Sequence, residues 1–320
     1  MILTCGDALI DFVPVAARDG SDAVRPMVGG SCLNVAVGLA RLGVPTGFVG
    51  GISNDLFGRM IAEHALESGV DLRFATRNDH QTTLAFVRHV NGESQYAFYD
   101  AETASRAWTY KHGAIPFETI DVVHIGSTTL VNERGATETA AMITDARPSA
   151  TISFDPNCRP NLVKDKEVYR ARMSMFAANA DIIRMSDVDF NYLYGEEADA
   201  ARAESLLAKG SGLFVVTRGV DGAEAWHHKT GPIKVDAPVV QVVDTIGAGD
   251  SFQSALLVAL HFQGRLARSR LKDIGRDELR LALSFACNCA ALTCTRVGAD
   301  PPRRGEITWV GQDLSGSKVN

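Results

Sequence analysis

The sequence predicts an α/β fold with a doubly wound, mainly parallel sheet, and two observations support this prediction. Short β-branched runs alternate with longer stretches of helical periodicity along the 320 residues, which is typical of βαβ crossovers that cover a sheet on both faces. The 46% hydrophobic content and the length suit one large domain or two modest ones. The expected strands include 2–5, 47–49, 122–125, 151–154, 182–185 and 214–217, and the expected helices include 33–42, 57–67, 136–146 and 197–208.

Two stretches break this alternation and predict a small β-hairpin lid. Residues 12–28 have no helical period, and residues 82–99 form two alternating runs around Asn91-Gly92, a strong hairpin signal. Such a hairpin is either a decorated sheet edge or a lid that closes over a substrate and excludes water. The predicted division is a nucleotide- and sugar-binding core of residues 1–11, 29–81 and 108–320, with a β lid of residues 12–28 and 82–107.

The composition excludes several classes of protein. A net charge of -6 and a pI near 5.8 give no long-range attraction to nucleic acid or to an anionic membrane. No apolar run approaches the roughly 20 residues that span a bilayer, and the first residues lack the basic start of a signal peptide. The six cysteines form no CxxC pair, which favours reduced, buried thiols. We therefore expect a cytoplasmic protein without nucleic-acid or membrane partners.

A glycine-rich turn between a β-branched strand and an apolar helix has a chemical interpretation. It reads DTIGAGDSF, with Gly247, Ala248 and Gly249 before Asp250. Glycines let a ligand approach the backbone, and the unpaired N–H groups of a helix start bind anions. A carboxylate there can accept the proton of an attacking hydroxyl, as phosphoryl transfer to an alcohol requires. The alternative is an ordinary N-cap, which stabilises a helix by about 1 kcal/mol without any catalysis.

A second motif, far upstream, favours the catalytic interpretation. In VGGSCLN, Gly29 and Gly30 allow close backbone approach, and the Asn34 amide can donate to and accept from sugar hydroxyls. The alternative is a glycine turn before a helix-capping Asn. This GG-x3-N segment, the following LGVPTGFVG and the later DTIGAGDSF together resemble the two signatures of the ribokinase-like (PfkB-type) carbohydrate kinases. The resemblance extends over residues 3–302 and is closest to bacterial fructokinases.

The resemblance implies an ATP-dependent sugar kinase of ribokinase-like fold, with Mg²⁺ on the nucleotide phosphates. In such an enzyme Asp250 is the general base, and the backbone N–H groups of Gly247, Ala248 and Gly249 form an anion hole for the transferring phosphoryl group. GDALIDF resembles the family's first strand, in which Asp11 matches the acid that binds sugar hydroxyls. FDPNCRP resembles the DPN-x-RP segment common in fructokinases and ketodeoxygluconate kinases, and its Arg159 could alternatively reach the transferring phosphate. The implied substrate-binding positions are Asp11, Gly29, Gly30, Asn34, Phe98, Asp100 and Arg159.

The resemblance also assigns residues to the nucleotide and to cations. DIIRMSDVDFNYLYG resembles the strand and helix that face the nucleotide phosphates and magnesium, and VVTRGVDGA resembles the nucleotide-binding turn. Near the adenine, where the family often has Asn, this chain has Cys287 followed by Asn288. The implied nucleotide-binding positions are Ser186, Asp189, Thr217, Gly219, Gly249 and Asn288, and the implied monovalent-cation (potassium) site is Asp244, Ile246 and Gly298.

The lid segment suggests which sugar is bound. TTLAFVRHVNGESQYAFYDAETAS is most similar to bacterial fructokinases. Ketodeoxygluconate kinases usually have a basic residue where this chain has Asp100, and an acid there repels an acid sugar. D-Fructose, converted to fructose 6-phosphate, is therefore the predicted substrate. The alternatives are a 2-keto-3-deoxygluconate kinase or another ribokinase-like sugar or nucleoside kinase, and a non-catalytic sugar sensor.

Apolar side chains on the lid strands predict a contact surface. Leu84, Phe86, Tyr96 and Phe98 lie on the two runs of the hairpin. They can pair with a second copy of the chain, or they can close over the substrate alone. We expect a homodimer through the lid strands, with closure alone as the alternative.

Overall fold

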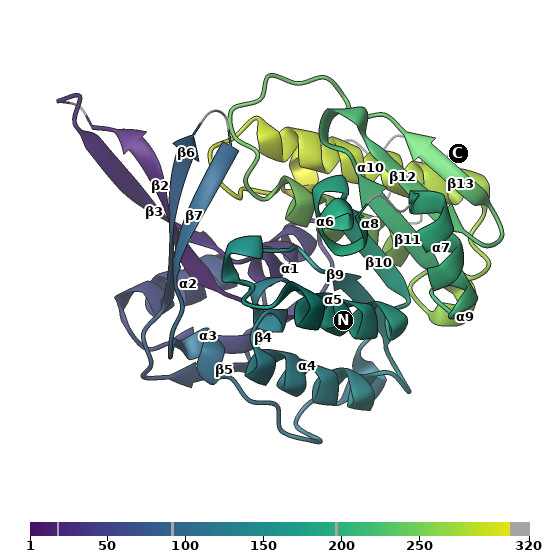
Figure 1. Cartoon of the computed structure of the whole chain (residues 1–320), viewed down its shortest axis with the longest axis horizontal. Helices are drawn as coiled ribbons and strands as arrows, with labels where there is room; N and C mark the ends of the chain where they lie inside the picture. Colours follow the sequence, from purple (N-terminus) through teal and green to yellow (C-terminus); the bar gives the residue numbers. More distant parts are fainter. Residues whose placement is uncertain (18, 91–92, 196–197, 308–320) are drawn as a thin grey trace.

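The computed structural model describes residues 1–17, 19–90, 93–195 and 198–307, and it contains a large sheet, a small sheet and covering helices (Figure 1). The large sheet has nine strands in the order β13-β12-β11-β10-β9-β8-β1-β4-β5. Its strands are parallel except for β12 and β13, which continue the sheet in antiparallel pairing. The predicted α/β, mainly parallel fold is therefore confirmed.

The expected strands and helices are present, with their ends shifted by a few residues. The turn Asn91-Gly92 and residue 197 lie outside the described residues. The strands are β1 (Ile2–Cys5), β2 (Leu9–Ala16), β3 (Asp22–Gly29), β4 (Thr46–Ser53), β5 (Ala75–Asn78), β6 (Thr83–Val90), β7 (Glu93–Tyr99), β8 (Val122–Gly126), β9 (Thr151–Asp155), β10 (Ile182–Ser186), β11 (Leu213–Thr217), β12 (Ala223–His227) and β13 (Gly231–Val235). The helices are α1 (Ser31–Arg41), α2 (Leu56–Glu67), α3 (Ala104–Ala107), α4 (Glu133–Ala146), α5 (Lys166–Ala178), α6 (Asp187–Tyr194), α7 (Asp199–Ala208), α8 (Ala248–Phe262), α9 (Arg268–Leu271) and α10 (Arg276–Cys294).

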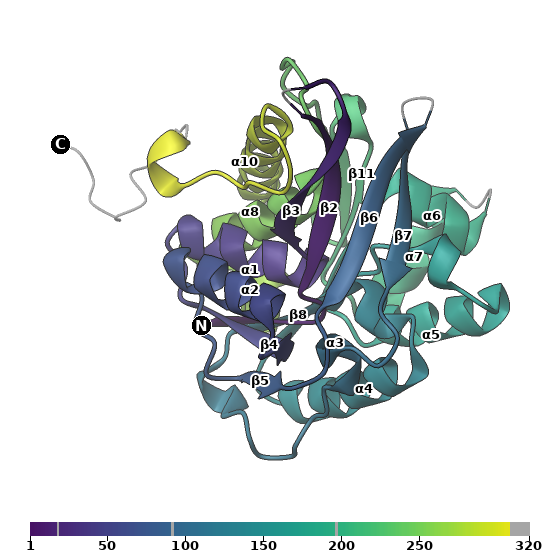
Figure 2. The ribbon, with the colours of Figure 1, turned by 90° about the vertical axis from the view of Figure 1, so that its left-hand side faces the viewer.

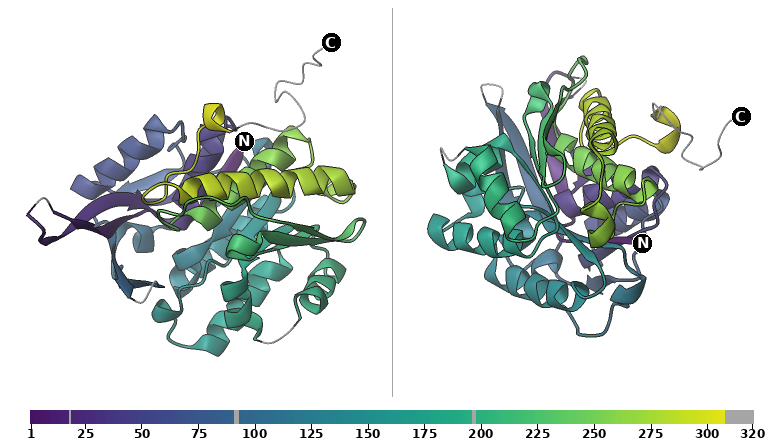
Figure 3. Two further views of the ribbon diagram at one scale, coloured as in Figure 1. Left: turned by 90° about the horizontal axis from the view of Figure 1, so that it is seen from above. Right: turned by 90° about the vertical axis from the view of Figure 1, so that its right-hand side faces the viewer.

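Several strands of the large sheet, such as β1, β8, β10 and β11, contribute side chains to two separate hydrophobic layers, because successive side chains point to opposite faces. On β8, Val122 belongs to the layer under α1, α8 and α10, and Val123 belongs to the layer under α4, α5, α6 and α7. Helices α8 and α10 pack side by side on the first face (Figure 3). Burial on both faces explains why the strands read as continuous apolar runs in the sequence.

The direction of chain progression reverses next to β1, and this places a crevice at one edge of the large sheet. From β1 the chain adds β4 and β5 on one side, and β8 to β11 follow in order on the other side. In open parallel sheets, ligands bind outside the carboxyl ends of the strands at such a switch point. The topology therefore directs attention to the residues that follow β1, β8, β9, β10 and β11.

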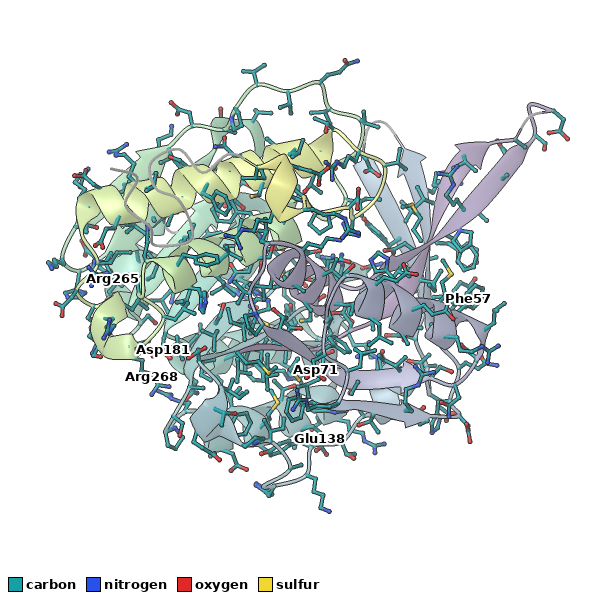
Figure 4. All side chains as sticks on the ribbon, turned by 180° about the vertical axis from the view of Figure 1, so that it is seen from behind. Phe57, Asp71, Glu138, Asp181, Arg265 and Arg268 are labelled. Atoms are coloured by element: carbon teal, nitrogen blue, oxygen red, sulfur yellow. The ribbon has the colours of Figure 1, made fainter. Side chains whose placement is uncertain are left out.

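The small sheet combines the two stretches that interrupt the α/β pattern, in the order β3-β2-β6-β7 (Figure 2). Strands β2 and β6 pair in parallel, and each also pairs with its own hairpin partner. We call this sheet the lid sheet. Its first strand begins at Leu9 and not at residue 12, so that Asp11 lies on the lid sheet itself. The ring of Phe12 packs edge-on against the ring of Phe57 of α2, with the ring centroids 5.7 Å apart, and this contact attaches the lid sheet to the core. Figure 4 labels Phe57.

In the described part of the chain, no helix has the length and apolar character needed to cross a bilayer.

Candidate active site

A cavity of about 650 Å³ lies between the carboxyl edge of the large sheet and the lid sheet, and most of the predicted sugar-site residues line it. Strand ends bring Asp7, Thr128 and Asn157 to the cavity, and the start of α8 brings Asp250. The predicted residues on its wall are Asp11, Gly30, Asn34, Phe98, Arg159, Ser186, Asp189, Ile246, Gly247, Gly249 and Asp250.

Asp250 is the third residue of α8, and its carboxylate is held by residues from distant parts of the chain. Ser31 Oγ donates to Oδ1 over 2.7 Å, and Asn34 Nδ2 donates to Oδ2 over 2.8 Å. The helix N-cap is Gly247, whose left-handed φ of 77° suits glycine. The N-cap interpretation of Asp250 is therefore wrong. Ser31 and Asn34 of α1, the helix that follows the glycines of the GG-x3-N motif, fix the carboxylate at the start of α8.

Burial sets the acid–base character of Asp250. Its side chain is buried, and this desolvation raises the pKa of the carboxyl to about 6, although the hydrogen bonds from Ser31 and Asn34 lower it. A pKa close to the working pH is suited to a general base, because the group is largely ionised and still accepts a proton effectively.

Asp11 enters the cavity from β2, opposite the glycines of the GG-x3-N motif. Burial raises the pKa of its carboxyl to about 7, and the nearby positive charge of Arg159 acts in the opposite direction. A Cβ on Gly29 would lie 2.1 Å from Asp11 Oδ2. A Cβ on Gly30, which has φ 104°, would lie 2.5 Å from the Asp7 carbonyl oxygen. Gly29 therefore makes room for the Asp11 carboxylate, and Gly30 makes room for the backbone of Asp7.

The lid sheet supplies an aromatic wall to the cavity around Asp250. The rings of Tyr96 and Phe98 stack with centroids 5.8 Å apart, and the guanidinium of Arg159 lies over the Tyr96 ring at 5.8 Å. Arg159 Nη1 also donates to the carbonyl oxygens of Asn157 and Cys158, at 3.1 and 2.9 Å. Arg159 is thus turned toward the lid, beside Asp11.

The structure places Asp100 in a neighbouring cavity of about 1130 Å³ rather than on the wall around Asp250. Its carboxylate forms an ion pair with Arg106, and Arg106 Nη1 donates to the Thr128 carbonyl at 2.9 Å. Because the pair carries no net charge, the sequence argument that Asp100 repels an acid sugar loses its basis.

A third cavity, of about 490 Å³, adjoins the glycine turn before α8 on the side of β11 and α10. Its walls are largely apolar, and they include Thr217, Gly219 and Ala248 as well as Cys287. Asn288 is exposed and does not line this cavity. The reason is helical geometry, since neighbouring residues on a helix point about 100° apart. The structure therefore does not bring Asn288 to the predicted adenine position, which Cys287 borders instead.

Ser186 and Asp189 are fixed where β10 passes into α6. Ser186 Oγ accepts from the Asp189 N–H at 3.0 Å and caps the helix, while Asp189 Oδ1 accepts from the Cys158 N–H at 3.0 Å. Burial and the neighbouring Asp155 carboxylate raise the pKa of Asp189, and a cation here would relieve this repulsion. A hard carboxylate oxygen beside a phosphate position fits Mg²⁺, which is usually held by one or two carboxylates and by substrate phosphates.

The three residues of the predicted monovalent-cation site converge. Asp244 Oδ1 accepts from the Ile246 N–H at 3.0 Å, and Oδ2 accepts from the Gly298 N–H at 2.8 Å. Among the described residues, no group of three or more His, Cys, Asp or Glu side chains forms a metal-binding cluster.

Some residues of this site were not assigned from the sequence. Asn157 Nδ2 donates to Ser31 Oγ at 2.6 Å and to Asp250 Oδ1 at 3.3 Å, and Asp7 accepts from the Ser127 and Thr128 hydroxyls at 3.2 Å each. Asp7 and Asn157 stand in the motifs GDALIDF and FDPNCRP, so their positions at strand ends were a usable signal.

Comparison with known proteins agrees with this geometry. The model of the pfkB family carbohydrate kinases matches residues 1–304. The chain is 36% identical over 281 residues to a fructokinase of Rhizobium leguminosarum bv. trifolii, which covers 88% of this chain and 86% of that protein. It is 33% identical over 320 residues to fructokinase-1 of Oryza sativa subsp. japonica, with 96% and 95% covered.

Solved structures give the same result. A fructokinase with bound ATP from Xylella fastidiosa superposes with a TM-score of 0.85 at 28% identity, covering 93% of both chains. A Vibrio cholerae O395 fructokinase in a fructose-, ADP- and calcium-bound form superposes with a TM-score of 0.80 at 26% identity, covering 93% of this chain and 94% of that one. The chain belongs to the pfkB family of carbohydrate kinases, and it is a sugar kinase.

Proposed function

We propose that this chain transfers the terminal phosphoryl group of ATP to D-fructose and produces fructose 6-phosphate. The observation that carries the proposal is the buried Asp250 carboxylate, which Ser31 and Asn34 hold at the mouth of an anion-binding helix start. The cavity of about 650 Å³, which we call the sugar cavity, lies on one side of this point. The apolar cavity of about 490 Å³, which we call the nucleoside cavity, lies on the other.

In the reaction, the fructose 6-hydroxyl oxygen forms a bond to the γ-phosphorus while the bond from phosphorus to the β–γ bridging oxygen breaks. ADP leaves with that electron pair, and the hydroxyl proton passes to Asp250. The backbone N–H groups of Gly247, Ala248 and Gly249 stabilise the negative charge on the transferring group. Asp11, Gly30 and Asn34 orient the sugar hydroxyls beneath the lid sheet, so positioning and electrostatics supply most of the rate.

Ser186 and Asp189 lie nearest the nucleotide phosphates in this proposal, and Thr217 and Gly219 border the nucleoside cavity. Mg²⁺, held at Asp189, would neutralise charge on the phosphates of bound ATP. Asp244 orients the backbone of Ile246 and Gly298, whose carbonyl groups are suited to a potassium ion. Potassium would support the anion-binding turn from behind.

Fructose is favoured by the names of the relatives and by the charges around the cavity. Two relatives above 30% identity are named fructokinases, and one solved relative binds fructose. Among the described residues that line the cavity, the acids Asp7, Asp11, Asp189 and Asp250 outnumber the bases Arg159 and Arg184. A neutral sugar suits this excess of carboxylates better than an acid sugar does.

A coupled ADP-release assay across fructose, ribose, 2-keto-3-deoxygluconate and adenosine tests the proposal. We expect the highest kcat/KM with fructose and a product phosphorylated at the 6-hydroxyl. A preference for 2-keto-3-deoxygluconate or a nucleoside would replace fructose as substrate. Sugar binding without any ATP turnover would identify a sensor and overturn the enzymatic proposal.

The outward face of the lid sheet is suited to a second copy of the chain. Strand register puts Phe12, Phe86 and Tyr99 on this face, where Phe86 is 38% and Tyr99 63% exposed. Phe12 and Phe86 stack with their ring centroids 4.7 Å apart. Apolar sheet faces of this kind mark association surfaces. Light scattering on the wild-type chain and on Phe86→Glu distinguishes a lid-mediated dimer from a monomer whose lid closes alone.

A further inference from the structure

Arg184 is the third of the five residues of β10, and its guanidinium reaches Asp155 and Thr217 at the carboxyl ends of β9 and β11. There it lies at the junction of the sugar cavity and the nucleoside cavity. Five residues line both cavities: Arg184, Ser186, Val188, Thr245 and Gly249. Of these five, only Arg184 carries a charge. The reaction that we propose brings its phosphoryl group to this junction, because the acceptor lies in one cavity and the donor in the other.

The guanidinium of Arg184 is buried and held from two sides. Nη1 pairs with Asp155 Oδ2 at 2.7 Å, and Nη2 donates to Thr217 Oγ1 at 2.5 Å. The Arg184 side chain is only 7% exposed and that of Asp155 only 3%. Its Nε is buried without a hydrogen-bond partner among the described residues. A buried donor left unpaired costs free energy, so this group needs a structural or functional explanation.

The same guanidinium covers the anion-binding turn. A Cβ built on Gly249 would lie 2.8 Å from Nη1 and 3.0 Å from Nη2 of Arg184. A cation is disfavoured at the start of a helix, because the N–H groups there already carry partial positive charge. The Asp155 carboxylate offsets part of this repulsion, and an anion held between the guanidinium and the N–H groups would offset the rest. The close approach of the guanidinium explains why Gly249 has no side chain.

We propose that Arg184 is a catalytic residue that contacts the phosphoryl group in transit and neutralises its charge in the transition state, together with the N–H groups of Gly247 to Gly249. Asp155 and Thr217 hold the guanidinium in place. Arg159, which is turned toward Tyr96 and Asp11, serves the sugar side instead. This inference rests on the proposed kinase reaction, and it adds a side-chain cation to the backbone anion hole.

Arg184→Lys and Arg184→Gln test the proposal. Loss of one transition-state donor typically lowers kcat by about 10²–10³, so we expect a loss of that size in Arg184→Gln. Arg184→Lys keeps the charge but loses the two-pronged geometry, and we expect an intermediate kcat. The KM for the sugar should change little, whereas Arg159→Gln should mainly raise it.

Calorimetry gives a readout that does not depend on turnover. With the sugar present, Arg184→Gln should weaken binding of ADP with aluminium fluoride, a mimic of the transferring group, by about 100-fold, and should change ADP binding alone far less. Arg268→Gln is the matched control, because it also breaks an arginine–aspartate pair next to β10 but lies away from both cavities. It should lower the melting temperature without these kinetic effects.

The outcomes separate the inference from the proposed function. If the wild type turns over no sugar, the proposed function fails. If it does turn over sugar, and Arg184→Gln retains kcat and aluminium-fluoride affinity within about threefold, the phosphate role of Arg184 is wrong. If the activity lost in Arg184→Gln only follows the fraction of the variant that is unfolded at the assay temperature, Arg184 is purely structural and the proposal is overturned.

Discussion

Strand β10 has an aspartate–arginine pair close to each of its ends, and the two pairs differ in what surrounds the arginine. At the amino end, Asp181 accepts from Arg268 Nε at 2.9 Å, and Figure 4 labels both residues. The remaining Arg268 groups donate to the carbonyl oxygens of Arg147 and Ala150, at 2.5 Å each. Every nitrogen of this guanidinium therefore bonds to protein.

At the carboxyl end, Arg184 pairs with Asp155 but keeps a buried Nε without a partner among the described residues, and it faces two cavities. The chemistry of the two pairs is similar, so their surroundings decide what they do. The amino edge of a parallel sheet contributes stability, whereas the carboxyl edge contributes binding and catalysis. The pair at the carboxyl edge thus differs from the pair at the amino edge because its arginine borders space that a ligand can occupy.

The largest expected effect lies at the carboxyl edge. Asp250→Asn keeps the shape of the side chain but cannot accept the hydroxyl proton, so kcat should fall by about 10²–10⁴. ATP binding, measured by calorimetry, should change little, because the nucleoside cavity does not include Asp250. Near wild-type turnover in this variant would show that another group is the base.

The pH dependence of kcat/KM for the sugar should report the two carboxyls with raised pKa values. The pKa is about 7 for the Asp11 carboxyl and about 6 for the Asp250 carboxyl. When the pH falls below its pKa, each carboxylate becomes protonated, so that Asp11 no longer orients the sugar as a carboxylate and Asp250 no longer accepts the hydroxyl proton. Activity should therefore fall on the acid side, by about tenfold per pH unit for each protonated group. In Asp11→Asn the higher of the two transitions should disappear. A profile that is flat down to about pH 5 would contradict both assignments.

Stability should respond to Asp250 in the opposite direction from activity. The folded-state pKa is raised from 3.8 to about 6, so the folded chain binds a proton that the unfolded chain has released between these values. Stability therefore falls as pH rises through this window, by at most about 3 kcal/mol. Asp250→Asn removes this cost, and its melting temperature should exceed that of the wild type at about pH 8 and approach it at about pH 4. A lower melting temperature at the higher pH would contradict this interpretation.

At the amino edge we expect a substitution to lower stability and leave turnover unchanged. Arg268→Gln removes the partner of Asp181 and two donors to carbonyl groups, and we expect a loss of about 2 kcal/mol in unfolding free energy, since hydrogen bonds to charged groups contribute about that much. Denaturant unfolding measures this loss, and the steady-state kcat should stay at the wild-type value. A large fall in kcat would remove the distinction between the two edges.

Much of the fold could be predicted from the sequence, because strands buried on both faces appear as unbroken β-branched runs. Residues 12–28 and 82–107 were predicted to form one β lid, but the parallel pairing of β2 with β6 was not predicted, since it joins segments that are far apart in the chain. Sequence motifs identified Asp250 and Asn34 as site residues. Their direct hydrogen bond could not be predicted, because it depends on how α1 packs against α8. No feature of the sequence singled out Arg184 as a site residue, because an arginine within an apolar strand does not reveal which neighbours bury it.

The smallest expected effect separates two neighbouring residues of α10. Cys287 is buried and borders the nucleoside cavity, whereas Asn288 is exposed on the outer face of the helix. Substitutions at exposed positions away from a site usually cost less than about 0.5 kcal/mol, so Asn288→Ala should change the KM for ATP by no more than about twofold. Cys287→Phe, which places a ring in the cavity wall, should raise that KM and leave the KM for the sugar unchanged. The two variants together test which face of α10 borders the nucleoside cavity, because a rotation of α10 by one residue would exchange the two results.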